Sequence, residues 1–117
     1  MLKDVLTRFS DISGLKGEEF SKWSYLCNDC LNYVLENTTK EELSAYDENR
    51  ICSLAAAIAF YKLALYDSER VSSFTAGDLH ISVEDIQNRA EKIMYAEMNS
   101  CSDITDFGGI SFMGVES

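Results

Sequence analysis

The sequence predicts a mainly α protein: a small bundle of about four helices, with one β-hairpin between the last two helices and an extended C-terminal tail. The chain of 117 residues contains no proline, so nothing in it interrupts a helix or marks a proline-rich linker. Residues 51–66 are apolar at 14 of 16 positions, whereas an ordinary surface helix is apolar along only one stripe. Residues 71–83 instead alternate with the two-residue period of a strand. We therefore expect a single helical domain over residues 1–100 and a docking tail over residues 101–117.

Two helices are expected in the first third of the chain. Residues 1–10 predict a short helix, and residues 11–17 predict a turn that contains two glycines. A second helix begins near Gly17 and ends at Asn37, with acidic residues at its start that suit the helix dipole. Its apolar residues recur every three or four positions and define one stripe: Phe20, Trp23, Cys27, Cys30 or Leu31, and Val34.

The third helix is the long central one. Thr38 or Thr39 is a suitable N-cap, and Glu42 follows Thr39 at the spacing of a capping box. The helix is amphipathic before residue 50, is apolar on most sides after it, and is expected to end near residues 68–70. Such a helix must be covered on several sides, and the short chain offers few other elements to cover it. We therefore expect part of its cover to come from another copy of the chain.

A hairpin and one further helix are expected next. Residues 79–83 alternate apolar and polar side chains, and residues 76–78 (Ala-Gly-Asp) supply the turn before them. Two strands alone are marginal in water, so this hairpin needs support from the helices or from a neighbouring copy. Ser82 then caps the last helix, which is expected to end near Asn99.

The tail over residues 101–117 differs in composition from the helices. It contains three glycines, which weaken any helix. A terminal segment that remains in water should be polar, and this one is not. We expect it to dock, either back onto its own domain or onto a partner, through the following residues: Ile104, Phe107, Ile110, Phe112, Met113 and Val115.

The charge balance disfavours a nucleic-acid binder. The chain has 20 acidic and 10 basic residues, a formal net charge of −10, and its basic residues are scattered. Proteins that bind DNA or RNA normally present a Lys/Arg-rich face, because phosphate contacts dominate their affinity. Residues 1–9 lack the apolar core of a secretory signal, and residues 51–66 are too short and too alanine-rich to span a membrane. We expect a soluble intracellular protein whose acidic surface repels DNA or meets a basic partner.

The sequence contains no motif that specifies a catalytic or metal site. Cys27 and Cys30 form a C-x-x-C pair, but they fall within a predicted helix, whereas a redox pair stands at a helix N-terminus. Zinc would need four ligands, and His80 is the only histidine. We expect two small core or boundary thiols, with a redox or metal role for the pair kept as an alternative. We expect no cofactor and no enzymatic activity.

The order of elements resembles that of the small head–tail connector proteins of tailed phages and prophages, also called head-completion or adaptor proteins. The resemblance covers roughly residues 40 to 117. Its parts are the alanine-rich helix over residues 54–66 (LAAAIAFYKLALY), the segment over residues 73–82 (SFTAGDLHIS), a further helix, and the aromatic, glycine-containing tail over residues 107–115.

The resemblance implies a structural virion-assembly protein that forms a ring under the portal and bridges portal and tail, while the genome passes through the ring. Its partners would be further copies of itself and the portal and tail proteins, without sequence-specific nucleic-acid binding and without a membrane. It would act in the host cytoplasm during assembly and remain in the virion of a mature particle. The expected interface residues lie in the hairpin and the tail: Phe74, Thr75, Leu79, Ile81, Val83, Ile104, Phe107, Ile110, Phe112, Met113 and Val115.

An acidic regulatory binder is the alternative function. A DNA mimic or another small prophage inhibitor would present carboxylates on one face at a spacing similar to that of phosphates. The net charge of −10 fits this class as well as it fits a connector.

Overall fold

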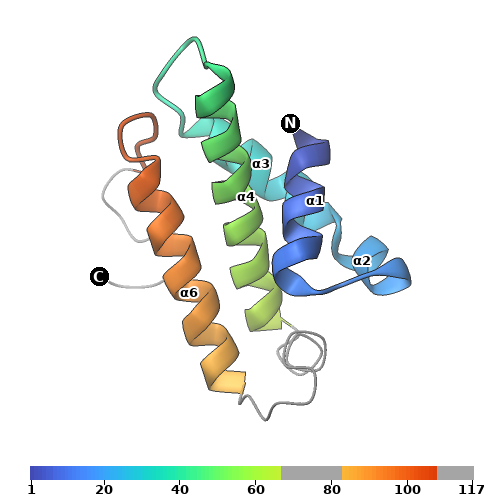
Figure 1. Cartoon of the computed structure of the whole chain (residues 1–117). Coiled ribbons are helices and arrows are strands. Elements are labelled where there is room, and N and C mark those ends of the chain that lie inside the picture. The colour runs from blue at the N-terminus through green and yellow to red at the C-terminus, as the bar shows by residue number, and fades with distance from the viewer. Residues whose placement is uncertain (67–82, 108–117) are drawn as a thin grey trace.

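The computed structural model describes residues 1–66 and 83–107, and within these ranges it contains five α-helices and no strand (Figure 1). The prediction of a mainly α fold is confirmed. The helices are α1 (Leu2–Ser13), α2 (Gly17–Trp23), α3 (Tyr25–Glu36), α4 (Ala45–Tyr66) and α6 (Val83–Ser100).

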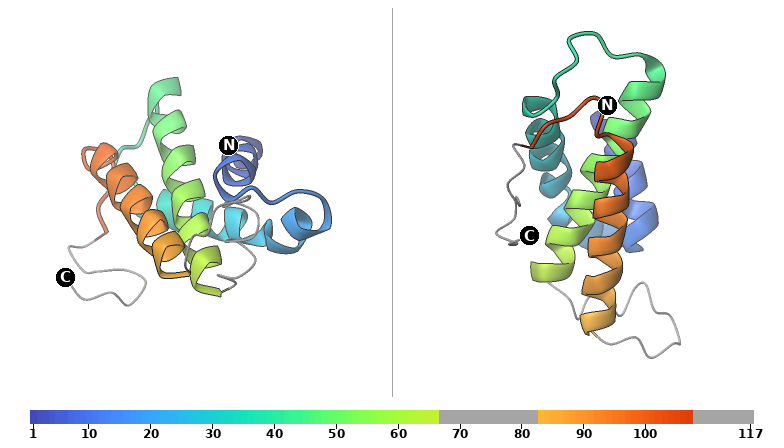
Figure 2. Two further views of the ribbon diagram at one scale, coloured as in Figure 1. Left: turned by 60° about the horizontal axis from the view of Figure 1, so that its bottom comes forward. Right: turned by 90° about the vertical axis from the view of Figure 1, so that its left-hand side faces the viewer.

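The helix α4 is the central element of the fold. It packs against α1, α3 and α6, while α2 extends outward beside α3 (Figure 1). The two further views show the same order, with α6 and α1 on opposite sides of α4 (Figure 2). The core therefore lies around α4, and the other helices each contribute one apolar stripe to it.

The first helix extends three residues beyond the predicted range. It ends at Ser13, and the following Gly14 adopts a left-handed conformation with φ 77° and donates its N–H to the carbonyl oxygen of Ser10. Val5 and Phe9 bury their side chains in the core. Arg8 connects α1 to α4, because its guanidinium donates to the carbonyl oxygen of Asn49 at 2.6 Å.

The predicted helix over residues 17–37 is two helices that meet at Ser24. The hydroxyl of Ser24 donates to the carbonyl oxygen of Ser21 at 3.0 Å, a local side-chain bond of the kind that competes with helix continuation. Trp23 is buried at this junction, with its ring 6.3 Å from that of Tyr25. The predicted stripe is nevertheless continuous across the break, and α3 ends at Asn37 as expected.

The central helix begins six residues after Thr39, so the predicted N-cap is wrong. Ser44 and Asp47 form the cap: the Asp47 N–H donates to the Ser44 hydroxyl oxygen at 3.1 Å, and the Ser44 N–H donates to the Asp47 carboxylate at 3.1 Å. The Thr39 N–H instead donates to the carbonyl oxygen of Ile104 at 2.9 Å, which holds this part of the chain in an extended connection.

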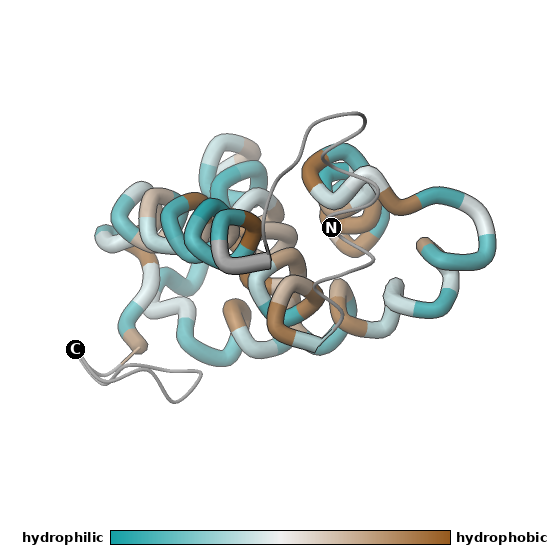
Figure 3. Tube along the Cα trace, turned by 90° about the horizontal axis from the view of Figure 1, so that it is seen from below, coloured by the Kyte–Doolittle hydropathy of each residue, from teal (hydrophilic) through white to brown (hydrophobic). Residues whose placement is uncertain are grey.

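The apolar part of α4 is covered within a single protomer, so the expectation of cover from another copy is wrong. Residues 51–64 are buried except for Ser53 and Lys62, and the alanines among them allow α1, α3 and α6 to approach closely. Seen end-on, hydrophobic residues gather between the helices, and hydrophilic residues occupy much of the outer surface (Figure 3). Within residues 51–66, only Leu65 and Tyr66 at the end of the helix are exposed.

The predicted hairpin over residues 71–83 cannot be compared with the structure over most of its length, because residues 67–82 lie outside the described part of the chain. The same holds for the Ser82 cap and for the predicted end of α4 at residues 68–70. Val83 is the first residue of α6, so its assignment to a strand is wrong. The last helix ends at Ser100, one residue after the predicted position.

Candidate functional site

The predicted interface residues fall into two groups. Ile104 and Phe107 lie at the bundle end that carries the loop from α3 to α4, and Val83 lies at the opposite end of α6 (Figure 1). Ile104 is buried in the chain's own core, and Phe107 is half-buried. The remaining predicted residues lie outside the described part of the chain: Phe74, Thr75, Leu79, Ile81, Ile110, Phe112, Met113 and Val115.

Residues 101–107, here called the C-terminal strap, cross back over the loop that joins α3 to α4. Thr38 and Thr105 form an isolated antiparallel bridge. Two backbone hydrogen bonds frame it: the Asp106 N–H donates to the carbonyl oxygen of Asn37 at 2.8 Å, and Ile104 accepts from the loop at 2.9 Å. The start of the predicted tail is therefore an ordered part of the bundle.

The strap ends in an aromatic contact. The ring of Phe107 stacks on that of Tyr33 of α3, with 5.5 Å between centroids and 25° between planes. Burial raises the pKa of the Tyr33 hydroxyl above its usual value. This contact holds Phe107, the last described residue of the chain, against α3.

An ionic cluster joins the strap to the first turns of α4. The Asp47 cluster consists of Lys40, Asp47, Arg50 and Asp103. The Asp47 carboxylate is buried and accepts from Lys40 at 2.6 Å and from Arg50 at 2.7 Å. The same guanidinium donates to Asp103 at 2.6 Å and to the carbonyl oxygen of Ser100 at 2.6 Å. One arginine thus holds together a helix start, the end of α6 and the strap.

The electrostatics of the Asp47 cluster favour its charged form. Hydrogen bonds from Lys40 and Arg50 hold the pKa of the Asp47 carboxyl well below its ordinary value. The pKa of Asp103 is lowered chiefly by its hydrogen bond from Arg50. The two carboxylates in turn raise the pKa of the Arg50 guanidinium. The cluster binds and positions chain segments, and it shows no nucleophile beside a base.

The cysteines are buried and are not activated. Cys27 and Cys30 are buried on α3, where burial, the main cause, raises their pKa to about 12 and about 11. A reactive redox thiol needs the opposite shift, toward the thiolate. Within residues 1–66 and 83–107, no three His, Cys, Asp or Glu side chains gather as a metal site would require.

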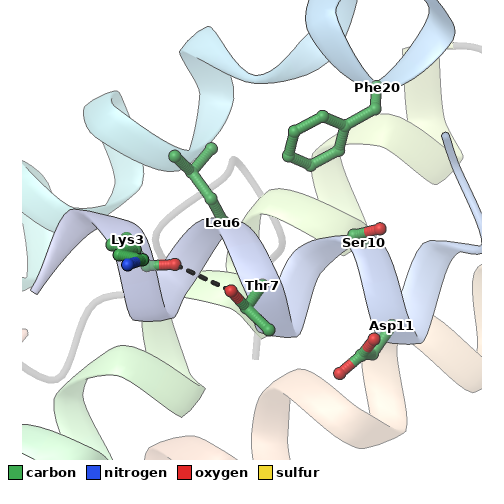
Figure 4. A pocket seen from close by; sticks show the side chains of 6 residues that line it. All are labelled: Lys3, Leu6, Thr7, Ser10, Asp11 and Phe20. Carbon is green, nitrogen blue, oxygen red and sulfur yellow. Dashed lines mark hydrogen bonds between the residues drawn. The ribbon is translucent and has the colours of Figure 1, made fainter. Parts of the chain in front are cut away.

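Two hollows lie on the surface of α1. The larger, of about 340 Å³, is bordered by residues of α1 and by Phe20 of α2 (Figure 4). The smaller, of about 220 Å³, lies where Arg8 and Ile12 of α1 face Ile93 and Glu97 of α6. The two hydroxyls of the larger hollow are already bonded: Thr7 donates to the Lys3 carbonyl oxygen at 3.0 Å, and Ser10 donates to that of Leu15 at 2.9 Å.

Comparison with known proteins identifies no relative: no protein-family model, no curated protein and no solved structure matches this chain. Among the helices of the described ranges, none combines the length and the hydropathy that a membrane crossing requires. The candidate site is therefore defined by geometry, as the bundle end where the α3–α4 loop, the Asp47 cluster and the C-terminal strap meet.

Proposed function

We propose that this chain is a structural virion-assembly protein, a head–tail connector subunit that assembles as a ring under the portal. Its partners in this proposal are further copies of itself and the portal and tail proteins, and no catalytic step is assigned to it. It would act in the host cytoplasm during assembly and remain in the mature virion. The sequence resemblance over residues 40–117 supports the proposal, and α4 and α6 are the helices of that region that the structure describes.

The anchored C-terminal strap is the observation that carries the proposal. The bridge at Thr38, the Arg50 ion pair and the Tyr33 contact give the following residues a fixed root on the bundle. Four apolar residues follow that root within residues 108–117, and a segment of this composition gains stability by burying its apolar side chains: Ile110, Phe112, Met113 and Val115. An apolar segment that begins at a fixed point on the bundle suits a subunit that must contact a neighbour.

The structure also removes some surfaces of the chain from the proposed interface. The burial of residues 51–64 within one protomer removes the apolar surface of α4 as an argument for association. Ile104 belongs to the chain's own core, so it does not serve as an interface residue without unfolding the strap. Ile104 is therefore removed from the proposed contacts, and the others remain those of residues 74–83 and 107–115.

A truncation that ends at Phe107 tests the proposal. The full chain and the truncated chain are each mixed with rings of the portal protein that the proposal requires in the same phage or prophage genome, and binding is measured by co-sedimentation and electron microscopy. We expect the full chain to form a ring on the portal, and the truncated chain to keep its helical circular dichroism but to remain unbound. Removal of residues 103–117 would be a poor test, because it deletes Asp103 and the buried Ile104.

A matched control removes only residues 116–117, which are polar, and should bind the portal like the full chain. Equal binding by the chain that ends at Phe107 would contradict the role given to the tail. If the full chain does not bind the portal ring, the connector function itself is contradicted.

An acidic regulatory binder is the second candidate, and one feature of the structure favours it. Exposed carboxylates gather at the bundle end where the strap meets the α3–α4 loop, while the basic residues there are engaged: Lys40 and Arg50 both bond to Asp47. A surface of this kind attracts a basic partner at long range. The exposed acids outside the Asp47 cluster are Glu36, Glu41, Glu42, Glu48 and Asp106.

The second candidate predicts competition with DNA. A basic DNA-binding protein, such as a nuclease, is titrated with this chain in the presence of labelled duplex DNA. The triple variant Glu41→Gln, Glu42→Gln and Glu48→Gln should lose inhibition, while neutralising the distant Glu18 should not change it. If the chain leaves DNA binding unaltered at low ionic strength, where such attraction is strongest, this candidate fails.

A further inference from the structure

The smaller of the two hollows, between α1 and α6, is lined by one base and one acid that are not paired with each other. Arg8 of α1 and Glu97 of α6 both line this hollow of about 220 Å³, and no ion pair joins them in the described part of the chain. At about 30 Å³ for each molecule of liquid water, the hollow has room for about seven waters. Its size therefore suits a small molecule better than a segment of another chain.

The guanidinium of Arg8 is held in place and keeps one edge free. Its Nη1 donates to the carbonyl oxygen of Asn49 at 2.6 Å and to the hydroxyl oxygen of Ser53 at 3.1 Å, and its Nη2 donates to the side-chain oxygen of Asn49 at 3.0 Å. Since Nη1 and Nη2 both bond to Asn49, that residue occupies the edge that they share. The next edge carries the Nε–H and the second N–H of Nη2, in the geometry that a carboxylate accepts with both oxygens.

Glu97 supplies the opposite charge and has no partner among the described residues. Its side chain is half-buried, and its carboxylate makes no hydrogen bond and no ion pair within residues 1–66 and 83–107. Neither this carboxylate nor the Nε of Arg8 is among the buried polar atoms without a partner, so solvent reaches both. Apart from Ser53, the rest of the lining is apolar: Ile12, Ala56, Ala57 and Ile93.

We propose that this hollow binds a small zwitterion, an aliphatic α-amino acid of about the size of leucine. The carboxylate of the ligand accepts from the free edge of Arg8, and its ammonium donates to the carboxylate of Glu97. Its aliphatic side chain removes the surfaces of Ile12 and Ile93 from water. The site does not depend on the proposed connector function.

The charges favour this class of ligand over other small molecules. The net charge of −10 repels an anion at long range, whereas a zwitterion carries no net charge. A cation without a carboxylate would be repelled by Arg8, and an uncharged ligand would desolvate both charged groups without pairing them. The nearby charges of α1 do not supply the missing partner: Asp4 forms no ion pair with Arg8 in the described part of the chain, and Lys3 and Asp11 line the other hollow.

Binding of L-leucine by the full chain tests the proposal, together with two analogues that each lack one charge. These are 4-methylpentanoate, which lacks the ammonium, and 3-methylbutylamine, which lacks the carboxylate. Each titration is followed by the amide chemical shifts of the protein in NMR spectra. We expect saturable shifts at Ser53 and Ile93, a Kd of about 1 mM for leucine, and binding of each analogue that is at least about tenfold weaker.

A single substitution tests the role of the acid. Glu97→Gln should weaken leucine binding at least about fivefold and should not weaken binding of 4-methylpentanoate, because only leucine carries the ammonium. The variant removes no bond among the described residues, so it should keep its helical circular dichroism. Glu91→Gln, at a half-buried acid on another face of α6, is the matched control and should bind leucine like the natural chain.

Three results would overturn the proposal. The first is a natural chain whose amide shifts do not respond to leucine at concentrations up to about 50 mM. The second is an analogue that binds as tightly as leucine, because one of the two charges would then have no role. The third is equal leucine binding by Glu97→Gln and Glu91→Gln.

Discussion

The two ends of α4 are built on different physical principles. Over residues 51–64 the helix is held by apolar contacts with α1, α3 and α6, and only Ser53 and Lys62 are not fully buried. Over residues 44–50 it is held by a cap and by the Asp47 cluster, whose bonds are directional and reach the C-terminal strap. The apolar end gives the bundle its stability, whereas the polar end determines where the loop and the strap lie.

The largest expected effect comes from the apolar end. Phe60→Ala should lower the free energy of unfolding by about 3–5 kcal/mol, because it removes a fully buried ring and leaves a cavity. Chemical denaturation followed by circular dichroism measures this. Leu65→Ala, on the exposed last turn of the same helix, should cost less than about 1 kcal/mol. Equal losses for the two variants would show that residue 60 does not lie in the interior.

A smaller and more local effect is expected at the polar end. Arg50→Ala removes the guanidinium that bonds to Asp47 and to Asp103, and should lower Tm by about 5 °C. Hydrogen exchange should become faster at the amides of Thr39 and Asp106, which bond across the strap, and should change little between residues 54 and 63. Arg89→Ala, an exposed arginine of α6, is the control and should alter neither region. A uniform increase in exchange would contradict the separation of the two ends.

The two ends should also respond differently to acid. The pKa of Asp47 is lower in the folded chain than in the unfolded chain, so the carboxylate binds fewer protons when folded. Its contribution is fully present above the unfolded pKa of about 3.9 and is lost as the pH falls further toward the folded pKa. Between about pH 5 and pH 2, Tm of the natural chain should therefore fall more steeply than Tm of Asp47→Asn. Parallel curves would show that the Asp47 cluster does not contribute to acid sensitivity.

The smallest expected effect is a difference between two buried cysteines in how soon each is alkylated. Cys30 on α3 and Cys101 in the strap are both buried, and burial is the main cause that raises the pKa of each to about 11, so neither thiol reacts readily until its segment opens. Under mild urea, alkylation followed by mass spectrometry should find Cys101 modified before Cys30, because opening the strap exposes the first without opening the bundle. Simultaneous modification would indicate that the strap and the bundle open as one unit. Early modification of Cys30 alone would reverse the proposed order.

Sequence patterns predicted a helix boundary well where residues close to that boundary in the sequence determine it. The glycine turn after α1, the end of α3 at Asn37 and the end of α6 within one residue all follow from residues close to those points. The start of α4 does not, because both Thr39–Glu42 and Ser44–Asp47 have the spacing of a capping box. The choice between them depends on the bond from Thr39 to Ile104, which lies far along the chain.

The cover of α4 and the Asp47 cluster were missed for related reasons. Three amphipathic stripes suffice to bury an alanine-rich helix, since small side chains bring neighbouring helices close, and composition alone does not reveal this. The sequence feature that could have indicated the cluster is Arg50. It lies on the same face of the predicted central helix as the apolar residues Leu43 and Leu54. A charge on such a face needs a buried partner, but its main partners, Asp47 and Asp103, could be identified only in three dimensions.

The contact between Arg50 and Asp103 joins residues separated by 53 positions, and the strap follows all the described helices in chain order. A ribosome adds about 5–20 residues per second, so Asp103 is synthesised roughly 3–10 s after Arg50. During this interval Lys40 and Ser44 of the α3–α4 loop can already bond to Asp47, but the backbone bonds of this loop to Ile104 and Asp106 are still absent. Closure of this end is therefore a late event in biosynthesis, completed only after the helices that it joins have emerged.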